Sequence, residues 1–272
     1  MAATTAVISA SGGYDAATIR PFVESVLRRS RADLQLIDIP RTPRPAWLQW
    51  LATQPRLHLH TCSTPMPPRQ LGVMRFPLIL QLMSTLNAEH VLLCDSRDAL
   101  LQADPFEFGD AALATSFLWL AMEERTLEEC PTNLSWLRRD GNSEELAAIR
   151  QRPILCAGTI LGSKSQLCQA LEQVTERIKT RLQNREEVPW ALDQATLNLL
   201  AWQDQLGVPF TARGNHDGFA LTLHHGAHLC LDRAGRLLLG NGQVAPIVHQ
   251  YDRIPWLADH LLRQLDGFSQ HR

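Results

Sequence analysis

The sequence predicts an α/β fold in a single domain, with a mostly parallel central sheet flanked by helices and a small antiparallel β region near the C-terminus. The chain has 272 residues, of which 45% are apolar, so it can bury one sizeable core. Short apolar runs bounded by turn residues alternate with segments of helical periodicity, which is the pattern of a sheet covered by helices. Near the C-terminus the runs shorten and glycine-containing turns join them, which is typical of small antiparallel strands.

The expected elements follow from these patterns along the chain. A strand at 90–94 is apolar throughout, which indicates burial on both faces. Asp15 and Ser163 stand where a helix N-cap is expected, and the acidic stretch at 123–129 is expected as a solvated helix face. The other predicted strands are 5–10, 33–39, 56–60, 111–120, 153–162, 219–223, 228–231, 236–239 and 245–248. The predicted helices are 16–29, 46–52, 70–86, 132–150, 164–184, 193–205 and 256–265.

Charge and composition exclude several classes of protein. The formal net charge is -2 and the isoelectric point is near 6.5, so neither a nucleic-acid footprint nor a polybasic membrane surface is indicated. The six cysteines form no Cys-x-x-Cys pair, which argues against a zinc ribbon or a disulfide framework. No apolar run approaches the roughly 20 residues of a spanning helix. We therefore expect a cytoplasmic protein without a transmembrane segment.

Two carboxylates, Asp95 and Asp98, directly follow the buried strand at 90–94. Open α/β sheets bind ligands at the carboxyl ends of their strands. Carboxylates at this spacing can hold one hard divalent cation, which usually keeps sites free for substrate phosphates. They can equally cap the turn that Asp104-Pro105 closes. These residues alone leave both interpretations open.

Other polar residues also have two interpretations. Arg75 lies within an apolar helix, so it either pairs with a carboxylate or reaches a phosphate. Asp193 is either a helix N-cap or a substrate ligand. His224, His225 and His228 are interpreted as turn and strand residues, because no cysteine or carboxylate pattern completes a zinc site around them.

The segment from Val91 to Phe106, a hydrophobic strand followed by Asp-Ser-Arg-Asp, an apolar pair and Asp-Pro-Phe, resembles the metal-binding segment of nucleotide-sugar glycosyltransferases of the GT-A fold. Three later segments resemble the retaining, glycogenin-like and galactosyltransferase-like branch in order, so that the resemblance covers most of the chain. They are Cys156-Ala-Gly158 with Gly162, Asp193-Gln194 with Asn198, and Val248-His249-Gln-Tyr-Asp-Arg253 with Pro255-Trp256. The usual metal pair is Asp-x-Asp, and here it is Asp-x-x-Asp, so which carboxylate binds the metal directly stays open.

The resemblance implies a role for each matching residue. Asp95, Asp98 and His249 would bind a metal, Mn²⁺ with Mg²⁺ as the alternative, and Asp193 and Gln194 would be the catalytic pair. Residues 1–110 would form the nucleotide-binding half of the domain and 111–272 the sugar and acceptor half. The implied donor-binding residues are Ser9, Ala10, Ser11, Arg75, Asp95, Ser96, Arg97, Asp98, Cys156, Ala157, Gly158 and Arg253.

The function expected from this resemblance is metal-dependent, retaining transfer of a sugar from a nucleoside diphosphate, uridine rather than guanosine, to a hydroxyl acceptor on a glycan, a small molecule or a protein. One alternative is a metal-dependent sugar nucleotidyltransferase. That class would show a glycine-rich loop with a basic residue near the first strand, and Ser11-Gly12-Gly13-Tyr14 has none. The other alternative is a non-catalytic module that binds a nucleotide sugar.

Overall fold

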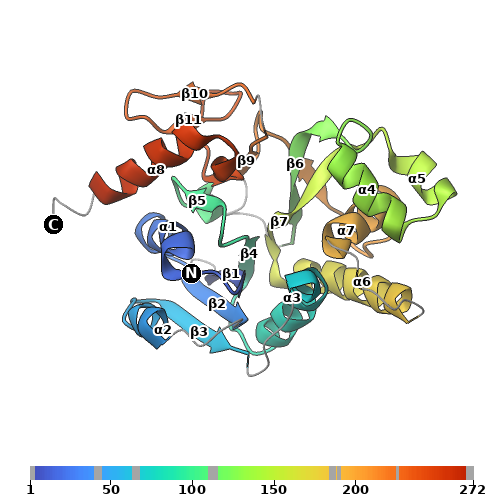
Figure 1. Ribbon diagram of the computed structural model, residues 1–272, viewed down its shortest axis with the longest axis horizontal. Helices are drawn as coiled ribbons and strands as arrows, with labels where there is room; N and C mark the ends of the chain where they lie inside the picture. The colour runs from blue at the N-terminus through green and yellow to red at the C-terminus, as the bar shows by residue number, and fades with distance from the viewer. Residues whose placement is uncertain are drawn as a thin grey trace.

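The structure, a computed structural model, describes residues 4–39, 45–62, 68–109, 116–183, 188, 191–224 and 227–267. A seven-stranded sheet in the order β3-β2-β1-β4-β7-β6-β8 forms its centre (Figure 1). Only β7 runs antiparallel to its neighbours in this sheet, so the predicted α/β class with a mostly parallel sheet is confirmed. The strands are β1 (Thr5–Gly12), β2 (Asp33–Ile39), β3 (Leu57–Thr61), β4 (His90–Cys94), β6 (Leu118–Thr126), β7 (Pro153–Ser163) and β8 (Thr211–Arg213).

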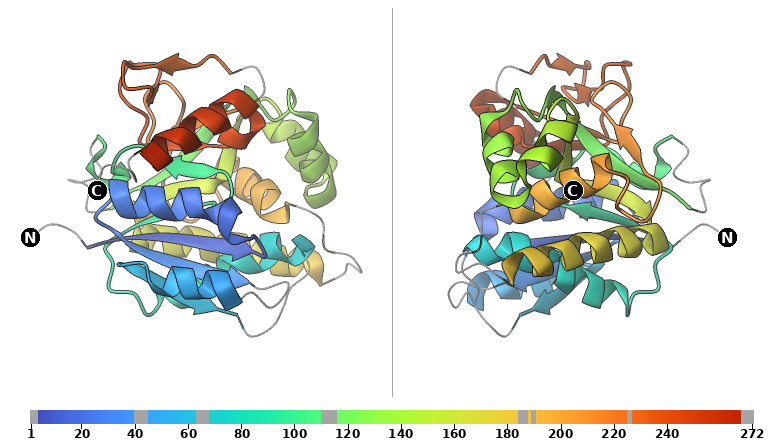
Figure 2. Two further views of the ribbon diagram at one scale, coloured as in Figure 1. Left: turned by 60° about the vertical axis from the view of Figure 1, so that its left-hand side comes forward. Right: turned by 90° about the vertical axis from the view of Figure 1, so that its right-hand side faces the viewer.

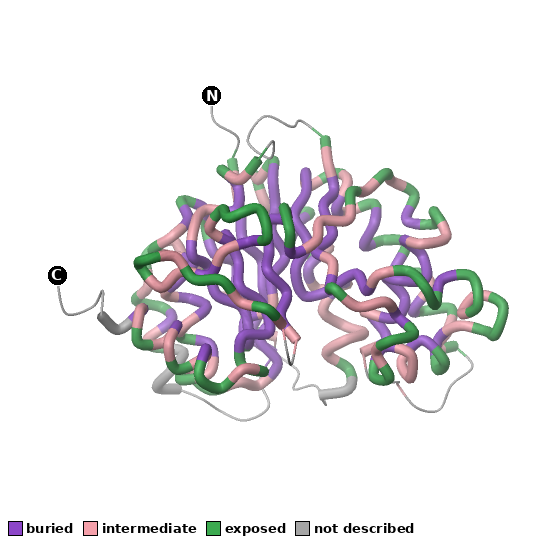
Figure 3. The backbone as a smooth tube through the Cα atoms, turned by 90° about the horizontal axis from the view of Figure 1, so that it is seen from above, coloured by how far each residue is buried: buried purple, intermediate pink, exposed green. Residues whose placement is uncertain are grey.

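Helices cover both faces of the central sheet (Figure 2). On one face lie α3 (Pro68–Met83), α6 (Lys164–Leu182) and α7 (Leu192–Trp202), and on the other lie α1 (Ala16–Arg29) and α2 (Pro45–Ala52). Successive residues of β4 alternate between these two cores: Val91 and Leu93 pack with α3 and α6, whereas Leu92 and Cys94 pack with α1. The strand is thus buried on both faces, as its apolar sequence predicted, and Figure 3 shows the buried segments gathered in the middle of the molecule.

Local chemistry explains where α1 begins and how it is held. The side chain of Asp15 accepts a hydrogen bond of 2.8 Å from the backbone N–H of Thr18, which confirms the predicted N-cap. At the other end of α1, the Nη1 of Arg28 donates to the carbonyl oxygen of Leu265 at 2.6 Å. That contact ties α1 to α8 (Pro255–Gly267), the C-terminal helix predicted from its amphipathic pattern.

A second, three-stranded sheet lies between α1 and α8. It consists of β5 (Ala99–Leu101), β12 (Ile247–His249) and β9 (Ala220–Thr222), with β12 in the middle, antiparallel to β5 and parallel to β9. The sequence predicted no strand at β5, because three residues are too few to show a period. The small antiparallel region expected near the C-terminus includes the pair β10 (Cys230–Leu231) and β11 (Leu237–Leu238).

Some elements differ from the prediction. Of the strand predicted at 111–120, residues 111–115 lie outside the described part of the chain, and β6 continues to Thr126, through part of the acidic stretch expected as a helix. Glu123 is buried and Glu124 is exposed, as strand alternation requires, so the helical interpretation was wrong. The surface helices expected at 132–150 are α4 (Pro131–Asp140) and α5 (Ser143–Ile149). Asp193 lies in the first turn of α7, and Ala191 is the N-cap.

No helix within the described ranges is both long and apolar enough to cross a bilayer. All six cysteines are free, as expected from their spacing.

Asn198 joins α7 to β7. Its Oδ1 accepts a hydrogen bond from the backbone N–H of Leu155, and its Nδ2 donates to the carbonyl of the same residue, both at 2.8 Å. Asn198 is fully buried. Its side-chain amide bonds the backbone N–H and carbonyl of Leu155, as a neighbouring strand would do. The side chain therefore has a structural role that fixes α7 against the sheet.

We predict that Asn198→Ala lowers the free energy of unfolding by about 2–4 kcal/mol, because it leaves two buried backbone groups of Leu155 without partners. Urea titration followed by circular dichroism measures this change. Asn241→Ala, at an exposed turn, is the matched control and should cost less than about 0.5 kcal/mol. Equal stabilities for the two variants would contradict the structural role of Asn198.

Candidate metal centre

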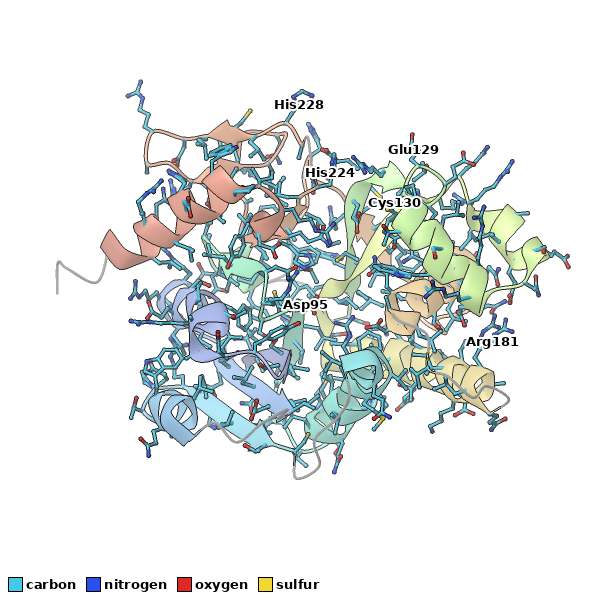
Figure 4. The ribbon with its side chains drawn as sticks, viewed as in Figure 1. Asp95, Glu129, Cys130, Arg181, His224 and His228 are labelled. Atoms are coloured by element: carbon cyan, nitrogen blue, oxygen red, sulfur yellow. The ribbon has the colours of Figure 1, made fainter. Side chains whose placement is uncertain are left out.

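A cavity of about 640 Å³ opens at the carboxyl ends of β1 and β4. The strand order reverses between these two neighbours, and open α/β sheets bind their ligands at such a point. The volume is in the range of small-molecule and cofactor sites. Ala10 at the end of β1 and Asp95 directly after β4 line the cavity, and Asp95 lies near the middle of the molecule in Figure 4.

The pairing of β5 with β12 brings three predicted metal ligands together. His249, the last residue of β12, lies opposite Ala99, the first residue of β5, and is therefore beside Asp98. The Nε2 of His249 is 3.5 Å from the Oδ1 of Asp98 and 3.8 Å from the Oδ2 of Asp95. The three ligand atoms lie within 4.8 Å of one another. The three side chains that the resemblance implies as metal ligands therefore lie together, and metal binding by them stays a prediction.

Each carboxylate is oriented by an arginine. The Nη1 of Arg75 donates to the Oδ1 of Asp95 at 2.8 Å, and the Nη2 of Arg97 donates to the Oδ2 of Asp98 at 2.8 Å. The remaining oxygen of each carboxylate faces His249. Burial alone would raise the pKa of Asp98, but His249 and Arg97 hold that pKa well below its usual range. Asp98 is therefore a carboxylate at neutral pH.

The imidazole of His249 is held from its other nitrogen. Its Nδ1 lies 3.2 Å from the Oγ1 of Thr159 and 3.4 Å from the Sγ of Cys156, both on β7. Burial disfavours a charged ring, but Cys156 and Asp98 outweigh it and raise the pKa of His249 well above 6.5. A second partner at one ring nitrogen is the usual way in which a metal-binding histidine is oriented.

These residues fit a divalent cation. The buried Nε2 of His249 makes long contacts with the carboxylates of Asp98 and Asp95, at 3.5 and 3.8 Å, and no shorter hydrogen bond within the described part of the chain. Two ligand atoms on opposite sides of a cation, each about 2.1 Å from it, lie about 4.2 Å apart. The ligand atoms here lie within 4.8 Å of one another, so small rotations of the carboxylates would bring all three into bonding distance of one cation. Two oxygens and one imidazole nitrogen suit manganese at least as well as magnesium. The side chain of Asp95 is 39% exposed, which leaves the site open toward the cavity.

Gly158 leaves room for these ligands. A Cβ at this position would overlap the carboxylate of Asp95 and would lie 2.8 Å from the Cε1 of His249. The carbonyl oxygen of Gly158 also accepts a 2.9 Å hydrogen bond from the N–H of Asp95. The glycine in the predicted Cys156-Ala-Gly158 segment is therefore required by the packing of Asp95 and His249.

Arg75 connects the candidate metal centre to α7. Besides Asp95, it forms an ion pair with Asp193 through its Nε at 2.5 Å, and its Nη2 donates to the carbonyl of Ala157 at 3.0 Å. Burial raises the pKa of Asp193, and the charge of Arg75 acts against that increase. The ion-pair interpretation of Arg75 is confirmed. The same side chain lines the cavity, so contact with a donor phosphate stays a prediction.

Gln194 lines the cavity next to Asp193, and both ends of its amide are bonded. Its Oε1 accepts a 2.8 Å hydrogen bond from the N–H of Ala157, and its Nε2 donates to the Oδ1 of Asn133 at 3.2 Å. Because the backbone N–H can only donate, these bonds fix which way the amide points. One N–H and one lone pair of Gln194 stay available to a ligand.

The other predicted donor-binding residues divide into two groups. Ser96, Arg97, Cys156 and Arg253 line the cavity with Ala10, and Arg253 is exposed at the end of η2 (Tyr251–Arg253). Ser9, Ser11 and Ala157 do not line it. The two serines are buried within β1, whereas Ala157 contributes its backbone to Gln194 and Arg75.

Sequence reasoning missed several residues of the cavity. Gln250 follows β12 in a left-handed conformation, with φ of 62°, and its N–H donates to the carbonyl of Asp98 at 2.7 Å. A non-glycine residue held in this conformation beside the metal ligands has no local sequence signal. The other lining residues without a predicted role are Tyr14, Leu71, Gly72, Glu123, Arg125, Cys130, Pro131, Thr132, Asn133, Trp136, Ala191 and His224.

We predict that Gly158→Ala weakens Mn²⁺ binding by at least about tenfold while the protein stays folded, because the added methyl group displaces two metal ligands. Electron paramagnetic resonance of free Mn²⁺ during a titration measures the affinity. Gly214→Ala is the control, since its Cβ would meet only the terminal methyl group of Met122. Unchanged affinity in Gly158→Ala would mean that the metal binds elsewhere.

Comparison of the sequence with models of protein families and with curated proteins finds no match.

Proposed function

We propose that this protein is a metal-dependent, retaining glycosyltransferase of the GT-A fold, which transfers a sugar from a nucleoside diphosphate, uridine in preference to guanosine, to a hydroxyl acceptor. The fold is consistent with the proposal, since its mostly parallel sheet and its small antiparallel C-terminal region are those that the resemblance implies. The loop after β1 carries no basic residue for a triphosphate, which makes the nucleotidyltransferase alternative less suitable.

One observation carries the proposal. Two segments far apart in the sequence, one that carries Asp95 and Asp98 and one that ends in His249, meet at the end of β4, and Asp193 and Gln194 open into the same cavity. A turn-capping role for the two acidic residues does not account for a buried histidine whose Nε2 faces both of them. A metal centre accounts for all three.

The proposed chemistry assigns a task to each part of the cavity. A divalent cation held by Asp95, Asp98 and His249 would neutralise charge on the diphosphate. Arg253 lines the same cavity and would add positive charge there. The acceptor oxygen bonds to the anomeric carbon, the bond from that carbon to the diphosphate oxygen breaks, and the hydroxyl proton leaves with the diphosphate.

Asp193 and Gln194 would hold the donor sugar. Arg75 fixes Asp193 relative to Asp95, so the sugar-binding carboxylate and the metal-binding carboxylate keep a set separation. The amide of Gln194 is fixed by Ala157 and Asn133, which would let its free N–H face the reacting carbon without rotation. This rigidity suits a reaction that depends on positioning.

We predict that uridine diphosphate with Mn²⁺ raises the melting temperature by about 5 °C at saturating concentrations. Asp98→Asn should lose that response, because it removes charge from a buried metal ligand. Asp33→Asn, exposed at the start of β2, is the control. A wild-type protein that responds to neither uridine nor guanosine diphosphate with Mn²⁺ would contradict the proposed function.

We also predict slow, Mn²⁺-dependent release of uridine diphosphate from at least one of UDP-glucose, UDP-galactose and UDP-N-acetylglucosamine. Asp193→Asn should reduce this release at least about tenfold while uridine diphosphate still binds, because Asp193 belongs to the sugar end of the cavity. Chromatography of the nucleotide products measures the rate. Formation of a nucleotide sugar from uridine triphosphate and a sugar 1-phosphate would instead indicate a nucleotidyltransferase.

A further inference from the structure

Glu123 is a buried acidic residue in the cavity wall that the proposed donor site does not use. It lies on β6 where the pairing with β7 is irregular: Leu120 pairs with Ile160 but Met122 pairs with Leu155. A second shift in register follows before Thr126. Irregularities of this kind redirect side chains next to functional sites. Here Glu123 turns into the cavity, among its lining residues.

Among the residues that the structure describes, the carboxylate of Glu123 has no hydrogen-bond partner. Glu123 is only 6% exposed, and no hydrogen bond or ion pair to it is found within the described residues. Burial raises its pKa, and the surrounding positive charges, of which Arg253 acts most strongly, lower it. A buried polar group without a partner is costly, and such groups usually meet a ligand or water. We therefore expect a ligand in the cavity to donate a hydrogen bond to the carboxylate of Glu123.

The cavity wall that includes Glu123 also carries residues to which the proposed donor site assigns no role. It includes Trp136 and Thr132 from α4 and His224 from the segment after β9. Figure 4 shows His224, together with Cys130 at the start of α4, on one side of Asp95. This part of the cavity has an aromatic ring and small polar groups, which is the environment that a sugar ring with hydroxyl groups requires.

Charge narrows the choice of ligand. A negatively charged group would be repelled by the carboxylate of Glu123. A positively charged group would meet Arg125 and Arg253, which line the same cavity. A neutral hydroxyl group can donate a hydrogen bond to the carboxylate without either cost.

We propose that Glu123 binds the acceptor of the transfer reaction, and that this acceptor is an uncharged saccharide whose hydroxyl group donates a hydrogen bond to the Glu123 carboxylate. The inference rests on the proposed function and names the class of its second substrate, the acceptor. Glu123 orients the acceptor beside the donor sugar, and its own protonation state does not change.

The test compares Glu123→Gln and Glu123→Ala with Glu128→Gln, a surface control that faces Arg150. Each protein is assayed for stabilisation by uridine diphosphate with Mn²⁺, for hydrolysis of the three UDP-sugars, and for faster nucleotide release when glucose, galactose, lactose, maltose or sucrose is added. Stabilisation by the nucleotide and hydrolysis of the donor need no saccharide acceptor. Stimulation by a saccharide reports acceptor binding.

In the wild-type protein and in Glu128→Gln, we expect at least one saccharide to stimulate release. In both Glu123 variants, stimulation measured relative to the same variant's own donor hydrolysis should fall by at least about tenfold, the cost of one hydrogen bond to a charged group. Glu123→Gln, which can still accept a hydrogen bond, should lose less than Glu123→Ala. The retained response to uridine diphosphate shows that the variants are folded.

Three outcomes would overturn the inference, and they are distinguishable. Equal stimulation in wild type and both Glu123 variants would exclude the role of Glu123. A wild-type protein that hydrolyses a donor but responds to none of the saccharides would exclude the acceptor class. A wild-type protein that neither binds uridine diphosphate nor hydrolyses a donor would remove the proposed function and this inference with it.

Discussion

The pairing of β5 with β12 is the constraint on which the candidate site depends. It sets His249 opposite Ala99 and so places the imidazole beside Asp98, although these residues are far apart in the sequence. Side chains alternate along a strand, so a slip of one residue would turn His249 away from the two carboxylates. The register is held by burial, since all three residues of each strand are buried. The core that stabilises the small sheet therefore also positions the candidate metal ligands.

Shared arginines give the site its rigidity. Arg75 binds both Asp95 and Asp193, so a carboxylate of the candidate metal centre and a carboxylate of the proposed sugar site are held by one side chain. Arg97 does the same for Asp98 and Asp252 at distances of 2.8 and 3.1 Å. Buried acidic groups at such close range need compensating charge, and the arginines supply it without occupying the oxygens that face His249. The cavity is thus organised before any ligand binds.

Local sequence patterns predicted those parts of the fold that depend on neighbours in the chain. The apolar run of β4 and the N-cap at Asp15 are examples, because burial on both faces and helix capping leave a signature within a few residues. By contrast, β5 is defined by its pairing with β12, and Glu123 lines the cavity from a part of β6 whose pairing with β7 is irregular. Such features arise from contacts between distant segments. The metal ligands were predicted from the resemblance, and no local pattern identified His249.

Anomalous X-ray scattering at the manganese edge, from crystals grown with Mn²⁺ and uridine diphosphate, tests the central claim most directly. The account predicts one strong peak within about 2.3 Å of ligand atoms from Asp95, Asp98 and His249, with the diphosphate on its open side. A peak bound to other residues, or none near His249 at a saturating concentration of metal, would contradict it.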